Sequence, residues 1–344
     1  MASGESNGLF KMKNFLGTIL LTGAGFTRNF GGLLASEMAD SIYNSNYLRG
    51  FPEIKKILHN ISNYEEFYEK VIIGDYSPQQ KDAVVSALSE AYERIDKAVR
   101  EWSYLSDGQV NIYGVRRLLG RFAGEANQCG FFFTLNQDLF AERQLTGDVH
   151  LEIPCVSSMP RHKNQLGPSD YVTLPTCSQL DQKLNDPIHP LSTGSRTLYF
   201  VKLHGSHNWL SSWLSPNGSR RMVIGPDKEG QINREPLLKW YKEIFKMVLG
   251  RGGVKLLVIG YSFRDEHINN VIADAIMNQG LELYVVCPDQ RVDFIGNLRK
   301  CPHGQILMEG LDKGKFWCGD LYKIFPGNQS TTDECQEIRR SLFP

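Results

Sequence analysis

Five short apolar runs constrain the fold of this chain more than any other feature. Each run is continuously hydrophobic rather than alternating, and each ends in glycine or in polar residues. Continuous hydrophobicity is typical of a parallel sheet that is covered by helices on both faces. The runs cover residues 18–25, 130–138, 197–206, 255–262 and 281–289. We also expect a short strand at 222–226 and an edge strand at 304–309.

The segment between the first two runs, residues 35–128, has the pattern of helices. Ser77 suits a helix N-cap and Pro78 the first helical position, and the apolar residues that follow recur at three- and four-residue spacing. A second helix is predicted over residues 111–126. Because the block is too long for one crossover helix, we interpret it as a helical insertion subdomain beside the sheet.

Two further segments complete the predicted organisation. Residues 139–196 are rich in Pro, Ser, Asp and Asn, which indicates a long loop region. Residues 315–344 are expected to form a C-terminal helix and tail. The alternation of strands and helices predicts a single α/β domain over residues 1–344. Its core would be a doubly wound, Rossmann-like parallel sheet with the helical insertion between the first two strands.

Composition excludes several classes of protein. Lys and Arg together number 38, as do Asp and Glu, so no overall field attracts the chain to nucleic acid or anionic lipid. No run reaches the roughly 18 apolar residues of a membrane span, and the N-terminus lacks the pattern of a secretory signal. The seven cysteines form no C-x-x-C pair, which argues against a disulfide framework or a zinc ribbon. We therefore expect a cytoplasmic protein without a metal.

Glycine and polar side chains follow the predicted strands, where the ligands of doubly wound sheets bind. The first strand runs into a glycine turn, and the later strands end in amide, carboxylate, imidazole and hydroxyl groups. The candidate residues are Gly23, Ala24, Gly25, Phe26, Thr27, Arg28, Asn136, Asp138, His204, Gly260, Tyr261, Ser262 and Asp289. In a parallel sheet all of them would face one crevice.

Each candidate also has an ordinary structural explanation. A G-x-G turn admits a pyrophosphate but also makes a plain tight turn, and Asn or Asp after a strand commonly caps the next helix. A histidine such as His204 can be a general base or a hydrogen-bonded core residue. Ser262 would cap the helix that follows it, and His267 in that helix would serve packing or surface. Taken singly, these residues do not decide the function.

The order of the motifs is more specific. G-A-G-F-T, T-L-N-Q-D, K-L-H-G-S and V-I-G-Y-S-F-R-D-E-H follow one another over residues 17–290, and this set resembles the sirtuin family, in particular its bacterial defence-associated branch. In sirtuins, motifs of these kinds line the NAD pocket. Arg28 stands where a dinucleotide fingerprint needs a third glycine, and the zinc ribbon and G-I-P-D-F-R signature of deacetylating sirtuins are missing. These departures disfavour hydride transfer and protein deacylation.

The resemblance implies an NAD+ hydrolase that cleaves the nicotinamide–ribose bond to nicotinamide and ADP-ribose, with NAD+ as substrate. Asn136 and His204 would be catalytic. Asn136 would orient the ribose or the attacking water, His204 would be the general base, and Asp138 would orient one of these groups. The turn Gly23–Phe26 would hold the diphosphate, helped by Thr27 and Arg28. The adenosine end would contact Gly260, Tyr261, Ser262 and Asp289.

The same resemblance implies a toxic effector of anti-phage defence acting by abortive infection. Such an enzyme would be activated through homo-oligomer assembly or by a partner in trans, either a DNA-translocating ATPase of the HerA class or a short Argonaute, and away from membranes. Three alternatives stay open from the sequence. They are an NAD-dependent protein deacylase or ADP-ribosyltransferase, a non-catalytic nucleotide-sensing module, and, more weakly, a partner-assisted nuclease.

Overall fold

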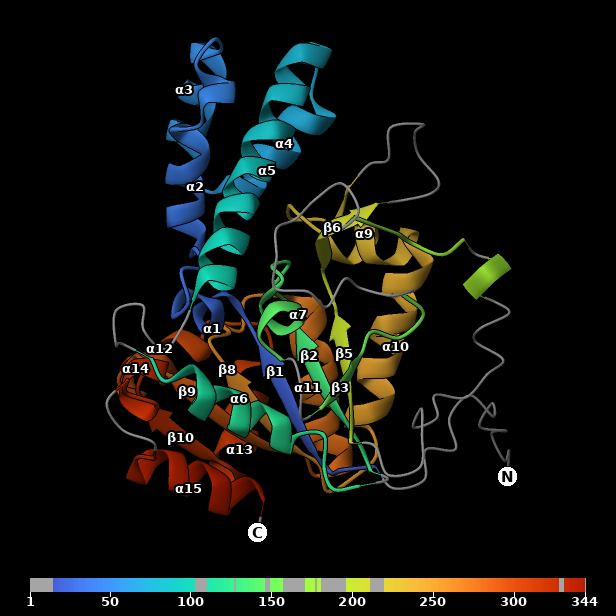
Figure 1. The fold of residues 1–344 in the computed structure, drawn as a ribbon, viewed down its shortest axis with the longest axis vertical. Coiled ribbons are helices and arrows are strands. Elements are labelled where there is room, and N and C mark those ends of the chain that lie inside the picture. Colours follow the sequence, from blue (N-terminus) through green and yellow to red (C-terminus); the bar gives the residue numbers. More distant parts are fainter. Residues whose placement is uncertain are drawn as a thin grey trace.

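A seven-stranded parallel sheet forms the centre of the protein, with strand order β10-β9-β8-β1-β2-β5-β3 (Figure 1). A computed structural model describes residues 15–102, 110–126, 128–145, 149–156, 171–176, 178–180, 196–210, 220–327 and 331–343. The strands are β1 (Thr18–Thr22), β2 (Cys129–Thr134), β3 (His150–Glu152), β5 (Thr197–Lys202), β8 (Lys255–Ile259), β9 (Glu282–Cys287) and β10 (Lys315–Cys318). The predicted Rossmann-like α/β fold is therefore confirmed.

The central strands are covered on both faces, as their continuous hydrophobicity predicts. Every residue of β1, β2 and β5 is buried. In the register of the sheet, Leu21 of β1 lies between Phe133 of β2 and Val258 of β8. Burial of one such side chain contributes about 1.5–3 kcal/mol, so these strands supply the part of the core on which the loops at their ends rest.

The sheet is doubly wound. The chain passes from β1 to β2 in one direction across the sheet and from β8 to β9 in the other, and right-handed crossovers then place the connecting helices on opposite faces. Helix α6 (Ile112–Arg121) accordingly lies in front of the sheet and α11 (Glu266–Gln279) behind it (Figure 1). On the rear face, α10 (Pro236–Leu249) and α13 (Gly304–Lys313) flank α11.

The helical insertion projects beyond the sheet above α1 (Figure 1). Within the predicted range 35–128, the elements before α6 are α2 (Ala35–Tyr43), the 3-10 helix η1 (Asn46–Leu48), α3 (Pro52–Ile61), α4 (Tyr64–Ile73) and α5 (Pro78–Glu101). Helix α1 (Ala24–Arg28) precedes this range, and α6 corresponds to the second helix predicted over residues 111–126. The predicted start of α5 is confirmed: the Ser77 hydroxyl accepts from the Gln80 amide, the Gln80 side chain accepts from the Ser77 amide, and Pro78 is the first helical residue.

The remaining elements lie around this core. A second sheet has the order β4-β6-β7. The elements are β4 (Val172–Thr173), β6 (Gly205–Leu210), β7 (Arg220–Met222), α7 (Phe140–Gln144), α9 (Lys228–Arg234), α12 (Arg291–Leu298), α14 (Leu321–Ile324) and α15 (Asp333–Leu342). None of the described helices combines the length and apolar character needed to cross a membrane.

Two strand predictions were wrong. Residues 304–309 belong to helix α13, whose buried residues Leu307, Gly310 and Leu311 have helical spacing, and the edge of the sheet is formed by β10 instead. Strand β7 ends at Met222, so the run at 222–226 is mostly turn. Short apolar runs do not distinguish strand from helix by themselves.

The segments predicted as loop and tail contain further elements. Within residues 139–196 the structure describes α7, β3 and β4, while residues 146–148, 157–170, 177 and 181–195 lie outside the described part. The C-terminal segment begins with strand β10 and continues into α14 and α15. Helix α15 is tied to the sheet because the Thr18 hydroxyl donates to the Leu342 carbonyl over 3.0 Å.

Candidate active site

The carboxyl ends of five neighbouring strands bring the candidate residues to one edge of the sheet. The order β9-β8-β1-β2-β5 places the residues that follow these strands side by side. Backbone hydrogen bonds continue past the strand ends, from the Leu135 amide to the Thr22 carbonyl and from the Leu203 amide to the Thr134 carbonyl, each over 2.9 Å. Asn136 and His204 therefore follow adjacent strands, β2 and β5, in matching register.

The glycines of the first turn are explained by packing against the turn after β8. A Cβ on Gly23 would lie 2.7 Å from the Gly260 carbonyl oxygen, and a Cβ on Gly25 would lie 2.9 Å from the Gly260 Cα. Gly260 has a φ of +67°, and its carbonyl accepts from the Gly25 amide over 2.9 Å. Close approach of two backbones therefore requires glycine here, whether or not the turn also holds a phosphate.

The other residues of this turn differ in exposure. Phe26 is buried and meets the Phe140 ring edge-on, with 4.9 Å between ring centroids. Arg28 is exposed and forms an ion pair of 2.8 Å with Glu37 of α2. Ala24 is exposed and Gly25 partly so. The surface that this turn offers to a ligand is thus mainly the backbone around Ala24 and Gly25.

Asn136 is held against the same turn. Its side-chain Nδ2 donates to the Gly23 carbonyl over 2.9 Å and to the Thr27 hydroxyl over 2.8 Å, and its backbone amide donates to the Thr134 hydroxyl over 3.0 Å. Both amide hydrogens are then engaged, which fixes the orientation of the side chain. Among the described residues, no donor contacts its Oδ1. The half-buried Asn136 therefore presents one acceptor.

Asp138 lies deeper, within a cluster of buried charges. Its Oδ1 accepts from the Phe140 amide over 2.9 Å just before α7, but the N-cap position of that helix belongs to Leu139, so the helix-capping role that the sequence allowed is not the one Asp138 has. Burial raises the pKa of Asp138, opposed by the nearby Lys202 ammonium. Lys202 is itself fully buried and donates to Glu142 over 2.8 Å and to the Asp138 carbonyl. These contacts anchor the loop that carries Asn136.

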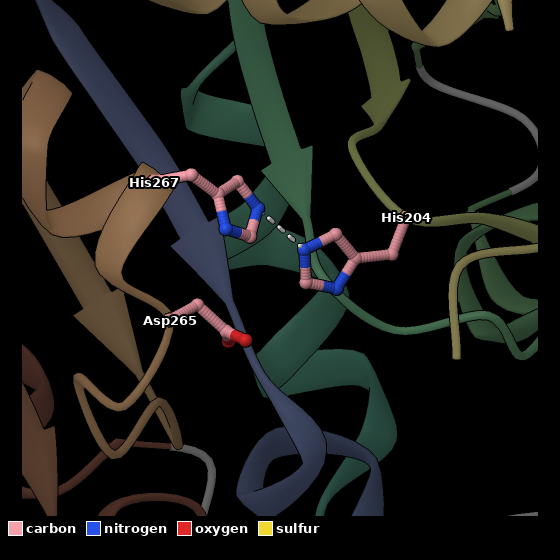
Figure 2. A group of neighbouring side chains, drawn as sticks. All are labelled: His204, Asp265 and His267. Carbon is pink, nitrogen blue, oxygen red and sulfur yellow. Dashed lines mark hydrogen bonds between the residues drawn. The ribbon is translucent and has the colours of Figure 1, made fainter. Parts of the chain in front are cut away.

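His204 meets a second histidine. Its Nε2 lies 3.0 Å from Nε2 of His267, on α11, and both rings are buried (Figure 2). Burial lowers the pKa of His204 to about 3 and that of His267 to about 4, so both rings are neutral at pH 7. One ring must then donate and the other accept, which requires complementary tautomers. Among the described residues, the Nδ1 of His204 has no hydrogen-bond partner.

Asp265 completes this group from the start of α11 (Figure 2). One ligand atom from each of His204, Asp265 and His267 lies within 4.8 Å of the others, a donor set that could hold a metal ion. However, the Lys228 ammonium lies 2.7 Å from Asp265 Oδ1 and already neutralises the carboxylate. A second cation beside it would be repelled, so we retain the expectation of no metal.

Asp265 and His267 were not among the predicted site residues. The sequence predicts a helix start here, with Tyr261, Ser262 and Asp265 forming an N-cap in which Ser262 is the capping residue, and with His267 on the surface or in packing. The structure corrects the cap, because Asp265 holds the N-cap position without a side-chain cap bond. The available signal was a carboxylate and an imidazole in the first turn of a helix just beyond a strand end. The sequence does not show where α11 lies relative to β5, and it is this placement that brings His267 into contact with His204.

The remaining predicted residues form no hydrogen bond with Asn136 or with the ring of His204 in the described part of the chain. Tyr261 is buried, and its hydroxyl accepts from the Asp265 amide and donates to the Asn269 side chain, each over 3.1 Å. Ser262 and Asp289 are exposed. Tyr261 thus positions the start of α11, whereas Ser262 and Asp289 lie on the surface beside it.

A comparison of the sequence with known protein families finds a match over the part of the chain that contains most of this site. Residues 131–300 match the family described as SIR2-like domain. These residues, just under half of the chain, are consistent with a sirtuin-like domain. The matched region begins in β2 and includes Asn136, His204, Asp265 and His267, while the glycine turn after β1 lies before it. SIR2-like domains use NAD+, so the family supports NAD-dependent chemistry. No curated protein matches the chain.

Proposed function

We propose that this SIR2-like domain is an NAD+ hydrolase that releases nicotinamide and ADP-ribose. The observation that carries the proposal is the placement of Asn136 and His204. They follow adjacent strands at the carboxyl edge of the sheet, and each has a polar atom without a partner among the described residues. An acceptor and a neutral imidazole at such an edge suit the orientation and deprotonation of a hydroxyl group.

Asn136 would orient the reacting oxygen. Its Nδ2 is committed to Gly23 and Thr27, so its Oδ1 is the atom that accepts a hydrogen bond from a ribose hydroxyl or the attacking water. Because the side chain is already fixed, little conformational entropy is lost when that bond forms.

His204 would be the general base through Nδ1. In the hydrolysis, the nicotinamide–ribose bond breaks with its electron pair going to the pyridine nitrogen, the water oxygen bonds to the ribose carbon, and one proton leaves the water. His204 is neutral, as a base must be, although burial makes it a weak one. The Asp265 carboxylate favours the imidazolium and partly offsets that cost.

The remaining predicted residues would hold the dinucleotide. Ala24 begins α1, so its amide has no acceptor within the helix, and the exposed backbone of this turn suits a diphosphate. Thr27 and Arg28 would extend this surface. Gly260, Tyr261, Ser262 and Asp289 would border the adenosine end. Asp138, which is buried at the start of α7, would act by positioning the Asn136 loop.

The proposed chemistry is tested by nicotinamide release from NAD+, measured by chromatography on the purified full chain. Asn136→Ala and His204→Ala are each expected to lower the rate about 100- to 10,000-fold, because each removes a positioned group that acts on the reacting oxygen. His59→Ala, at an exposed position of α3, is the matched control and should retain the wild-type rate. Wild-type turnover by both site variants would overturn the assignment.

We further propose that the enzyme is a toxic effector of anti-phage defence, activated by self-assembly or by a partner such as a HerA-class ATPase or a short Argonaute. The sequence resemblance supports this role. The rate of nicotinamide release should rise when protein concentration is increased or the partner is added, and cells that carry the pair should lose NAD+ on phage infection. An unchanged rate in every combination would instead favour a nucleotide-sensing module.

A further inference from the structure

A chain of charged side chains runs from the helical insertion to the histidine pair. Glu65 lies in the first turn of α4, and its Oε2 is 3.0 Å from the Lys228 ammonium at the start of α9. Lys228 lies 2.7 Å from Asp265 Oδ1, and Asp265 borders His267 and His204. Glu65, Lys228 and Asp265 come from three separate elements, so the contact depends on how the insertion sits on the SIR2-like domain.

The two carboxylates stabilise the charge of Lys228, whereas burial, with a smaller contribution from Asp265, raises the pKa of Glu65. Burial alone would lower the pKa of Lys228, but the carboxylates of Asp265 and Glu65 outweigh it and raise the pKa. Burial would likewise raise the pKa of Asp265, but neighbouring groups, including the Lys228 ammonium, outweigh it and lower the pKa. Lys228 is thus a permanent cation shared by two carboxylates. Removal of Glu65 would leave the ammonium to Asp265 alone and draw that carboxylate away from the histidines.

A second contact ties the insertion to the backbone of His204. The Tyr92 hydroxyl of α5 donates to Gln137 Oε1, and Gln137 Nε2 donates to the carbonyls of His204 over 3.3 Å and Val223 over 2.8 Å. The Tyr92 ring also stacks on His207 with an interplanar angle of 8°. Helices α4 and α5 therefore reach the His204 segment by two routes, one through its side chain and one through its main chain.

We propose that Glu65 is a positioning residue for His204, acting through Lys228, Asp265 and His267, so that the seating of the helical insertion sets the orientation of the catalytic ring. Glu65 touches neither ring. It determines how Lys228 divides its hydrogen bonds, and hence where the Asp265 carboxylate lies beside His267. A shift of α4 away from α9 would loosen His204 without disturbing the sheet. The catalytic consequence of this coupling rests on the proposed NAD+ hydrolysis, whereas the coupling itself does not.

The test compares Glu65→Gln with Glu66→Gln in the full chain. The two glutamates are neighbours in the first turn of α4, but Glu66 is exposed and its side chain bonds only locally, to Asn63, among the described residues. The first readout is the set of ring-nitrogen resonances in protein labelled with nitrogen-15 histidine, assigned with His204→Asn and His267→Asn. Glu65→Gln should shift the resonances of both rings, and Glu66→Gln should shift neither.

The second readout is NAD+ turnover under activating conditions. Glu65→Gln should lower kcat about tenfold, as expected for residues coupled in one network, with KM unchanged. Lys228→Met should act in the same direction and Lys228→Arg should restore most of the rate, because Arg keeps the cation. A melting curve for each variant verifies that it is folded, and Glu65→Gln alone suffices if Lys228→Met does not fold.

The outcomes separate the two proposals. Shifted ring resonances in a protein that turns over no NAD+ would support the coupling and overturn the proposed function. Unchanged resonances and unchanged kcat in Glu65→Gln, in a protein that does hydrolyse NAD+, would overturn the coupling alone. A fall in kcat of equal size in Glu66→Gln would also overturn it, because the effect would then belong to the helix rather than to Glu65.

Discussion

At the scale of single residues, the same side chain types serve structure and chemistry, and geometry separates the two. Gly23 and Gly25 are required by the turn at Gly260, which a Cβ on either residue would displace. Phe26 is a core residue, and Arg28 is paired with Glu37. By contrast, Asn136 and His204 each have one polar atom without a partner among the described residues. What these two residues share is an available polar atom at the carboxyl edge of the sheet.

The buried histidines should make the stability of the protein depend on pH. Their folded-state pKa values of about 3 and about 4 lie below the ordinary value of 6.5, so the unfolded chain binds protons in mild acid that the folded protein does not. Stability is then complete above about pH 6.5 and is lost as the pH falls toward these values. At pH 5 each histidine lowers the free energy of unfolding by about 2 kcal/mol relative to pH 7.

Urea unfolding at pH 7 and pH 5 measures this effect. In His267→Asn the decrease between the two pH values should be smaller than in the wild type by about 2 kcal/mol, because one of the two groups has been removed. His59→Asn, which changes an exposed histidine, should show the full wild-type decrease. Equal decreases in wild type and His267→Asn would mean that this ring is protonated in the folded state.

At the scale of elements, helix α5 is the main attachment of the insertion to the domain. Asp96 of α5 receives two hydrogen bonds from Arg143 of α7, at 3.0 and 3.3 Å, and both side chains are almost completely buried. One turn further, Gln144 donates to the Val99 carbonyl over 2.6 Å. Since α7 follows the loop that carries Asn136 and Asp138, these contacts fix that loop as well as the helix.

Asp96→Ala is expected to lower the free energy of unfolding by about 3–5 kcal/mol, because it removes the carboxylate that balances the buried Arg143. Replacement of both partners by apolar residues, in Asp96→Leu with Arg143→Met, should cost less than the single change. Glu101→Ala, at the exposed end of α5, should have little effect. Urea unfolding measures the free energy of unfolding of each variant. If Asp96→Ala were as stable as the wild type, the pair of Asp96 and Arg143 would contribute nothing to this attachment.

Elements were predictable where the local signal was strong. Continuous hydrophobicity predicted the central strands, and Ser77, Pro78 and the helical periodicity that follows them predicted α5. Residues 304–309 were misassigned because their apolar part, Ile306 to Met308, is too short to distinguish the period of a strand from that of a helix, and strands β3 and β10 were missed because most of their residues are not buried. Edge strands lack the hydrophobic signature of central ones.

At the scale of the whole molecule, the sheet order and the insertion together make the site. The order β8-β1-β2-β5 brings Gly260, Gly23, Asn136 and His204 to the same edge of the sheet. Helix α11 follows β8, yet its first turn reaches His204 after β5, three strands further along the sheet. The insertion contacts this edge through Glu65 and Tyr92. The site therefore draws on segments that lie far apart in the chain.

The sequence by itself determined the α/β class, the central strands, the helical insertion and the polar residues that follow each strand, because these depend on local hydrophobic periodicity and on residue types at strand ends. The contact of His204 with His267, the charged chain from Glu65 to Asp265 and the close approach of Gly23 to Gly260 were decided only by the tertiary structure. Each of these contacts joins residues from different elements. The distance between such residues depends on strand order and helix tilt, and these are set by the free energy of the whole packed core rather than by any local pattern.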